Sequence, residues 1–187
     1  MRDFEFKAGS PCLDLVDTLS GRGAGEVDLL TSPADVARWA HGSGRLAYAA
    51  GAVGDIATLR SLREAIFNAA SACIDAAPMD DADLAVINAA ASVGAPRPVL
   101  TRDGVVMRAD DPFGAMMAEI AGDAIALLGG ERRARLRRCG GCNMLFFDAS
   151  PPGRRKWCSS AAGCGNQAKT RNRRARIAAQ QHGKAPQ

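Results

Sequence analysis

The sequence has few of the side chains on which most catalytic sites depend. Its 187 residues include only two histidines and one tyrosine. The histidines, His41 and His182, stand far apart, so neither a histidine-dependent triad nor a histidine metal-hydrolase site has visible parts. The sequence also lacks a Gly-x-Gly-x-x-Gly segment after a strand and a phosphate-binding Gly-Lys-Thr loop. We therefore expect no enzyme, although carboxylates that are distant in the sequence could still meet in a pocket.

Long hydrophobic runs are absent as well. No apolar stretch approaches the roughly 18 residues that span a bilayer, and the chain begins with mixed charges where a signal peptide would have an apolar core. The content of 47% hydrophobic and 24% charged residues is that of an ordinary globular protein. We expect a soluble, cytoplasmic protein without membrane contact, built as one domain or as one domain with a small appended module.

Acidic residues are nearly missing from the last third of the chain. Residues 131–187 contain 14 Lys and Arg against two acids, whereas residues 1–130 contain 10 Lys and Arg against 18 acids. The net charge of +4 therefore conceals an acidic body and a basic end, a pattern that suggests nucleic acid as the partner of the basic end. A solvated basic tail is the alternative. The change near Gly129-Gly130 predicts a boundary between residues 1–130 and 131–187.

Several segments of the first 130 residues have the capping residues and the three-to-four-residue apolar spacing of helices. One helix is expected to begin after Ser32 and to end at Gly42-Ser43-Gly44. Others are expected from Asp55 to about Ala77, from Asp81 to Val93, and from Asp111 to Gly129. Their Leu, Ile, Met and Ala stripes predict a buried core.

Strand signals are fewer. Asp103-Gly104 between two β-favouring runs indicates a hairpin, and Leu145-Phe146-Phe147 is a β-favouring arm. Residues Arg132 to Arg138 are expected to continue helically into the cysteines. The predicted fold class is mainly α with a small β-hairpin: a helical N-terminal domain, then a four-cysteine zinc finger followed by a basic helix.

Four of the six cysteines are clustered, with the spacing Cys139-x2-Cys142-x15-Cys158-x5-Cys164. Four thiolates satisfy tetrahedral zinc without histidine, and a chain without an export signal favours a metal over disulfides. Gly140 and Gly141 are expected to supply the backbone freedom of the first turn. We predict one structural Zn²⁺ ion whose binding stabilises this small module. A redox dithiol is the main competing use of Cys-x-x-Cys.

A helix with a basic face is expected after Cys164. At about 100° per residue, its cations gather on one face and on the flanks, and alanines gather on a face that could pack on the zinc module. Trp157 is expected to pack against the metal site rather than on a base. The predicted nucleic-acid contacts are the cations on both sides of Cys158: Arg154, Arg155, Lys156, Lys169, Arg171, Arg173, Arg174 and Arg176.

These residues resemble two known families. Cys139 to Lys169 reads CGGCNMLFFDASPPGRRKWCSSAAGCGNQAK and resembles the CGNR zinc finger, with its Cys-x-x-Cys, Phe-x-Asp-x-Ser, Arg-Arg-x-Trp-Cys and Cys-Gly-Asn elements. Upstream, Leu13 to Thr18, Leu30 to Pro33 and Leu62 to Ala65 resemble the ABATE domain of stress-induced transcription regulators. The resemblance implies a bacterial transcription regulator. Residues 1–130 would be a regulatory, ligand-sensing domain for a small-molecule effector, and residues 131–187 a zinc-bound DNA-binding element.

Three departures from the CGNR and ABATE patterns stand out. Gln167 replaces the arginine of the CGNR name, and Pro151-Pro152 replaces residues that are usually basic and polar. If that arginine contacts DNA, binding here is weaker or has a different sequence preference. Asp17 stands where the family usually has asparagine, and we expect it to be a surface acid beside a helix rather than part of a ligand pocket.

The expected function is a DNA-binding transcription regulator that contacts duplex DNA, with a homodimer natural for a palindromic site. Two alternatives stay open. Phosphate contacts do not distinguish DNA from RNA, so the module could be an RNA-binding or ribosome-associated element. Cationic neighbours could keep the thiolates reactive, which would suit a redox-responsive interaction switch. The scarcity of aromatics for stacking unpaired bases favours duplex DNA.

Overall fold

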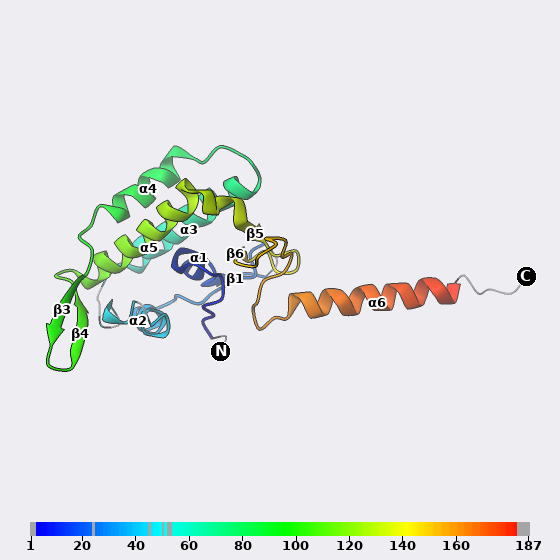
Figure 1. Ribbon diagram of the computed structural model, residues 1–187, viewed down its shortest axis with the longest axis horizontal. Coiled ribbons are helices and arrows are strands. Elements are labelled where there is room, and N and C mark those ends of the chain that lie inside the picture. Colours follow the sequence, from blue (N-terminus) through cyan, green and yellow to red (C-terminus); the bar gives the residue numbers. More distant parts are fainter. Residues whose placement is uncertain (1–2, 24, 45, 50, 52–53, 183–187) are drawn as a thin grey trace, which may run out of the picture.

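The computed structural model describes residues 3–182 apart from residues 24, 45, 50, 52 and 53. Helices make up most of this part of the chain (Figure 1). They are α1 (Pro11–Val16), α2 (Pro33–Gly42), α3 (Ile56–Ile74), α4 (Asp81–Ala91), α5 (Pro112–Gly129) and α6 (Cys164–His182), with 3-10 turns η1 (Ala47–Ala49) and η2 (Glu131–Arg135).

The strands form three separate antiparallel pairs in the described part of the chain. The pairs are β1 (Leu19–Ser20) with β2 (Val27–Asp28), β3 (Arg97–Thr101) with β4 (Gly104–Arg108), and β5 (Leu136–Arg138) with β6 (Leu145–Phe147). The predicted fold class is therefore confirmed: the chain is mainly helical, with small hairpins and a four-cysteine cluster that precedes a final helix.

The helix starts follow from their capping residues. The Ser32 side chain accepts a hydrogen bond from the backbone N–H of Asp35, whose carboxylate accepts one from the N–H of Ser32. This reciprocal capping box satisfies two backbone donors that the first turn of α2 leaves free. The carboxylates of Asp55 and Asp111 cap α3 and α5 in the same position. These caps explain why the predicted helix starts agree with the structure to within one residue.

The hydrophobic core lies between α1, α3, α4 and α5. Figure 1 shows α3, α4 and α5 side by side, and α1 packs against both α3 and α5. By length and mean hydropathy α5 would also pass as a membrane span, although Glu119 and Asp123 interrupt its apolar sequence. Because 56% of α5 is buried inside the protein, we assign it as a core helix.

A buried ion pair joins α3 to the first hairpin. Arg63 on α3 is only 3% exposed, and its two terminal nitrogens donate to the carboxylate of Asp28 on β2 at 2.8 and 3.0 Å. Its Nε donates to Glu64 at 2.8 Å. Two parallel N–H···O bonds are the strongest pairing available to a guanidinium. This pair fixes the hairpin β1–β2 against the helical layer.

The β5–β6 hairpin attaches the cysteine region to the helices. β5 packs against α3, β6 packs against α1, and the backbone N–H of Phe147 donates to the carbonyl of Ala8 at 2.7 Å. The prediction of a continuous helix over residues 132–138 is wrong, because only the 3-10 turn η2 forms before the chain extends into β5. The pairing of Leu136 with Phe147 supplies backbone partners that a local propensity argument does not see.

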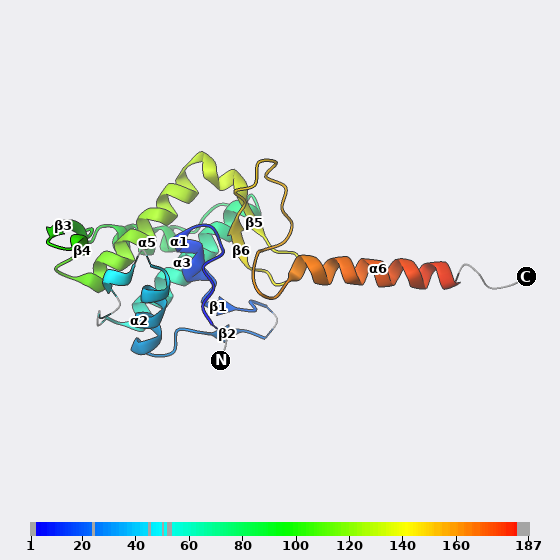
Figure 2. The ribbon, with the colours of Figure 1, turned by 60° about the horizontal axis from the view of Figure 1, so that its bottom comes forward.

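The final helix, α6, leaves the body of the protein. In Figures 1 and 2 it projects to one side as a single rod, and the hairpin β3–β4 lies at the opposite end. Its 19 residues correspond to a length of about 28 Å. The position of α6 is therefore set by its first turn alone, which contains Cys164.

Candidate metal centre and basic helix

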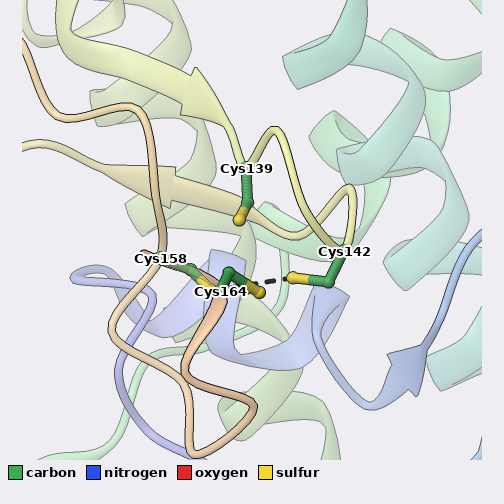
Figure 3. Close-up of side chains that lie close together, drawn as sticks. All are labelled: Cys139, Cys142, Cys158 and Cys164. Carbon is green, nitrogen blue, oxygen red and sulfur yellow. Dashed lines mark hydrogen bonds between the residues drawn. The ribbon is translucent and has the colours of Figure 1, made fainter. Parts of the chain in front are cut away.

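Four cysteine side chains converge at the base of α6 (Figure 3). Cys139 follows β5, Cys142 lies three residues later in the same loop, and Cys164 is the first residue of α6. All four Sγ atoms lie within 4.8 Å of one another, with 3.6 Å between Cys142 and Cys158. A regular tetrahedron with Zn–S bonds of 2.3 Å has sulfur–sulfur distances of about 3.8 Å. The spacing fits one zinc ion and excludes disulfides, whose sulfurs lie about 2.05 Å apart.

The surroundings of the thiols suit a cation. Burial acts to raise the pKa of Cys139, but backbone N–H groups donate to its sulfur and lower the pKa to about 7. Burial raises the pKa of Cys164 to about 11 and moves the pKa of Cys142 in the same direction. The thiolate form is therefore favoured at Cys139 and disfavoured at Cys142 and Cys164, where a divalent cation would compensate the charge.

Two glycines make room for this cluster. A Cβ atom on Gly141 would lie 2.9 Å from Cβ of Cys164, and one on Gly140 would lie 3.2 Å from the ring of Trp157. Neither glycine has a positive φ angle; in this loop that conformation belongs to Asn143, with φ of 60°. The prediction that these glycines supply backbone freedom is therefore wrong. They are needed because the second cysteine pair and Trp157 come too close for a side chain.

Trp157 packs where it was predicted to pack. Its indole lies against Gly140 and Gly165, whose added Cβ atoms would approach it within 3.2 and 3.4 Å. The ring is half-buried beside the metal ligands. Since one face of the indole is occupied by the backbone of the zinc region, the main role of Trp157 in this structure is to cover that region.

A buried aspartate organises the long loop between the cysteine pairs. Asp148 is fully buried, and its carboxylate accepts hydrogen bonds from the hydroxyl and backbone N–H of Ser150 and from the N–H of Arg155. The Ser150 hydroxyl is the main reason that the pKa of Asp148 is lowered to about 2. Asp148 therefore stays ionised and holds the loop in the shape that returns Cys158 to the first pair.

Several arginines of the basic region bind the protein itself. Arg135 donates to the carbonyl of Ser150 at 2.7 Å, and Arg137 donates to that of Gly153 at 2.9 Å. Arg138 pairs with Asp75, the residue that follows the end of α3, at 2.9 Å. Arg155, which was predicted to contact nucleic acid, lies over the ring of Phe146 and donates to the carbonyl of Trp157. The charge count alone did not distinguish these structural arginines from available ones.

The remaining predicted contacts are exposed. Arg154 and Lys156 lie on the surface of the loop. Every described side chain of α6 from Lys169 to Ala178 is exposed, including Ala175. The expected packing of an alanine face on the zinc module is therefore wrong for Ala175, whereas Ala168 near the start of the helix is buried. The side chain of Ala179, the third alanine of that face, lies outside the described residues. The structure gives these cations no ion-pair partner within its described part: Arg154, Lys156, Lys169, Arg171, Arg173, Arg174 and Arg176.

Sequence reasoning missed one feature of the neighbourhood. Asp17, expected as a surface acid, is half-buried in the wall of a cavity of about 660 Å³ beside the metal centre. The cavity wall also contains Trp39 and residues of the cysteine loop such as Asn143. No local sequence signal could have found it, because its walls come from parts of the chain more than a hundred residues apart.

The fold and the cysteine cluster together define a protein with a helical body and a zinc finger that holds one structural zinc ion. Comparison with protein families agrees. The model of ABATE, described as a putative stress-induced transcription regulator, matches residues 9–131, and the CGNR zinc finger matches residues 135–177.

Because the ABATE match covers more than half of the 187 residues, the chain belongs to the ABATE family, as the sequence resemblance predicted, and it ends in a CGNR zinc finger. Neither family is described as an enzyme. A comparison with curated proteins found no match.

Proposed function

We propose that this protein is a cytoplasmic transcription regulator without catalytic activity that binds duplex DNA through α6. In this proposal the zinc ion fixes the first turn of α6, and the rest of the helix lies along the DNA. The supporting observation is the helix itself: from Lys169 to Arg176 it presents five cations and no acid, all exposed. A helix of this width fits the major groove of B-DNA.

The cations divide into two groups by their surroundings. Lys169, Arg171, Arg173, Arg174 and Arg176 would meet phosphates or base edges, and Arg154 and Lys156 would meet phosphates beside the start of the helix. Arg155 acts differently, since its contacts are internal: it would position the loop that presents its neighbours. A helical segment whose side chains are all exposed, as they are from Lys169 to Ala178, is marginally stable in water, so DNA would also stabilise α6.

The test is fluorescence anisotropy of a labelled duplex with zinc-loaded full-length protein across a salt series. Each phosphate contact contributes about −0.9 to the slope of log K against log salt. We expect R173Q/R176Q to reduce the steepness of the slope by about 2 and to weaken binding at least tenfold at moderate salt. Glutamine forms helices about as well as arginine, so helicity is kept.

The matched control carries the same change of charge elsewhere. R102Q/R108Q removes two exposed arginines from the hairpin β3–β4, which lies at the opposite end of the protein from α6 (Figure 1). We expect this variant to bind like the wild type. Equal losses of DNA affinity in both variants would show that only the net charge of the protein matters. An unchanged affinity of the R173Q/R176Q variant would contradict a role of α6 in binding.

Selection from random duplexes and competition with single-stranded RNA separate this function from its alternatives. Enrichment of one motif supports regulation at a specific site, whereas uniform, purely salt-dependent binding argues against it. RNA that displaces the duplex at equal salt would favour the RNA-binding alternative. In the same proposal, residues 1–130 form the regulatory domain and residues 131–187 the DNA-binding element, and a palindromic motif would indicate a homodimer.

A further inference from the structure

A cavity of about 660 Å³ lies where three distant parts of the chain meet. Its wall is formed by the N-terminal segment, by the end of α1 with the turn into β1, and by the zinc region. The volume is in the range of small-molecule sites. The residues that form the wall are in the ranges 3–7, 14–22, 141–145 and 160–162, together with Leu29, Trp39 and Phe67.

Acidic groups outnumber available cations in this wall. Of the two cations, Arg22 pairs with Glu64 at 2.7 Å and lies over the ring of Phe67, and Lys7 lies 3.8 Å from Glu5. Glu5 itself accepts hydrogen bonds from the backbone N–H of Ala161 at 2.9 and 3.1 Å. The cavity therefore keeps a negative character that its own cations do not neutralise.

Asp17 is a carboxylate of this wall that has no partner among the described residues. It is half-buried, and within the described part of the chain the structure gives its side chain no hydrogen bond and no ion pair. Burial and the negative charges of Glu5 and Asp14 raise the pKa of Asp17 to about 7, although Arg22 opposes the shift. A partly buried carboxylate without a partner is costly, and a bound cation would remove that cost.

The rest of the wall indicates an organic cation. Trp39 belongs to this wall, although only 1% of the residue is exposed. Phe4 and Phe67 add apolar surface. A metal ion fits less well, because in the described residues only the four cysteines bring three or more ligand atoms of His, Cys, Asp or Glu within reach of one ion.

We propose that this cavity binds a small organic ammonium compound. Its ammonium group pairs with Asp17, and its apolar body lies among the aromatic side chains. A carboxylate beside apolar side chains in one pocket is a general arrangement for recognising an amine, since the carboxylate attracts the positive charge and the apolar side chains cover the rest of the molecule.

A ligand in the cavity would affect α6 through a short segment of the chain that connects them. Residues 160–162 line the cavity and end two residues before the helix begins. The side-chain nitrogen of Gln167, in the first turn of α6, donates to the carbonyl of Ala162 at 2.8 Å. A ligand that shifts this loop would therefore shift the base of the helix. This part of the proposal rests on the proposed function, since it makes the ammonium compound the effector of DNA binding.

The test uses two probes that share one skeleton. Zinc-loaded full-length protein is titrated by calorimetry at pH 8 with tyramine and, separately, with 3-(4-hydroxyphenyl)propanoate, which replaces the ammonium by a carboxylate. We expect tyramine to bind at least tenfold more tightly. D17N should weaken tyramine at least tenfold, and D17E, which keeps the charge, should keep the preference for the amine. D103N, in the exposed turn of the hairpin β3–β4, is the matched control and should bind like the wild type.

Several results would overturn the cavity as an ammonium site. These are equal or tighter binding of the propanoate, no detectable binding of tyramine at millimolar concentration, or a D17N variant with unchanged affinity and zinc content. Binding of Mg²⁺ or Ca²⁺ that depends on Asp17 would show that the cavity binds a metal ion rather than an amine. If D17N loses its zinc, D17E and the two probes on the wild type still decide the question.

DNA binding is measured separately, so that the two proposals fail in different ways. We expect saturating tyramine to change the affinity of the protein for a duplex at least threefold. Tyramine binding with unchanged DNA affinity would remove the effector role and keep the site. A protein that binds tyramine and no DNA, with or without the ligand, would contradict the proposed function alone.

Discussion

The helical body and the zinc region are held together by different interactions. Between α1 and α5, large apolar side chains fill a continuous core, and Arg63 with Asp28 forms a buried ion pair beside it. In the zinc region, arginines donate to backbone carbonyls of the loop and thiols meet around one ion. The body can be stabilised by burial alone, whereas the zinc region is too small for that and depends on its metal. Charge therefore has a structural use in both regions, whereas the described cations of α6 are all exposed.

The largest expected effect comes from removing the metal. C139S should lower the zinc content from one ion per chain to almost none. The zinc region then loses the free energy of metal binding, which is about 10 kcal/mol or more for a structural site. Residues 136–182 should then be digested by protease while the helical body keeps its far-UV circular dichroism. The matched control is C73S, in a half-buried cysteine of α3. If C139S retains zinc, the assignment of this ligand is wrong.

A smaller effect is expected from the buried ion pair of the body. Burial acts to raise the pKa of Asp28, but the hydrogen bonds from Arg63 outweigh it, so the pKa is lower than usual. A lowered pKa means stability that is present above about pH 4 and lost as the pH falls through the folded-state pKa. The side chain of Asp28 is 25% exposed and also pairs with Arg60. D28N leaves Arg63 without its bidentate partner, and we expect a loss of about 2 kcal/mol at pH 7.

The measurement is urea unfolding at several pH values. The difference between wild type and D28N should shrink below pH 4, because the wild-type carboxylate becomes protonated there. A difference that does not change with pH would show that the loss comes from packing rather than from charge. Zinc content should stay at the wild-type level in D28N, since the pair lies in the body.

The smallest effects are expected when the same substitution, glycine to alanine, is made once in each region. G141A places a Cβ atom 2.9 Å from Cβ of Cys164, so the two cysteine pairs must separate and zinc should be released faster to a chelator. G122A lies on the exposed face of α5, with no atom within 4 Å of the added methyl group. There alanine should stabilise the helix by about 0.5–1 kcal/mol. Equal behaviour of the two variants would show that Gly141 has no steric role.

The sequence predicts those features of the fold that depend on neighbouring residues. The cap at Ser32, the turn before Gly104 and the spacing of the cysteines each act within a short segment, and each prediction is confirmed. The strand β5 was predicted as helix, because its partner β6 lies beyond the cysteine loop. In the same way, contacts between distant segments place Asp17 in a cavity wall, and the path of the loop between the cysteine pairs places Arg155 against Phe146.

The roles of the cations in the candidate DNA site could be predicted only in part. Their number and the helical spacing after Cys164 were visible in the sequence. Which of them are available depends on the path of the loop, since Arg137 reaches the carbonyl of Gly153 and Arg138 reaches Asp75. A count of charges treats all of these residues alike.

The contact between Glu5 and Ala161 has a consequence for the order in which this protein folds during synthesis. The two residues are 156 positions apart in the sequence. Ala8 and Phe147, which share a backbone hydrogen bond, are separated by almost as many residues. At about 5–20 residues per second, the ribosome releases the first member of each pair many seconds before the second. The N-terminal segment therefore finds its final partners only after the cysteine loop has emerged. Cys164, the last of the four cysteines, follows Ala161 by three residues, so this long-range docking becomes possible at nearly the same moment as the complete set of zinc ligands.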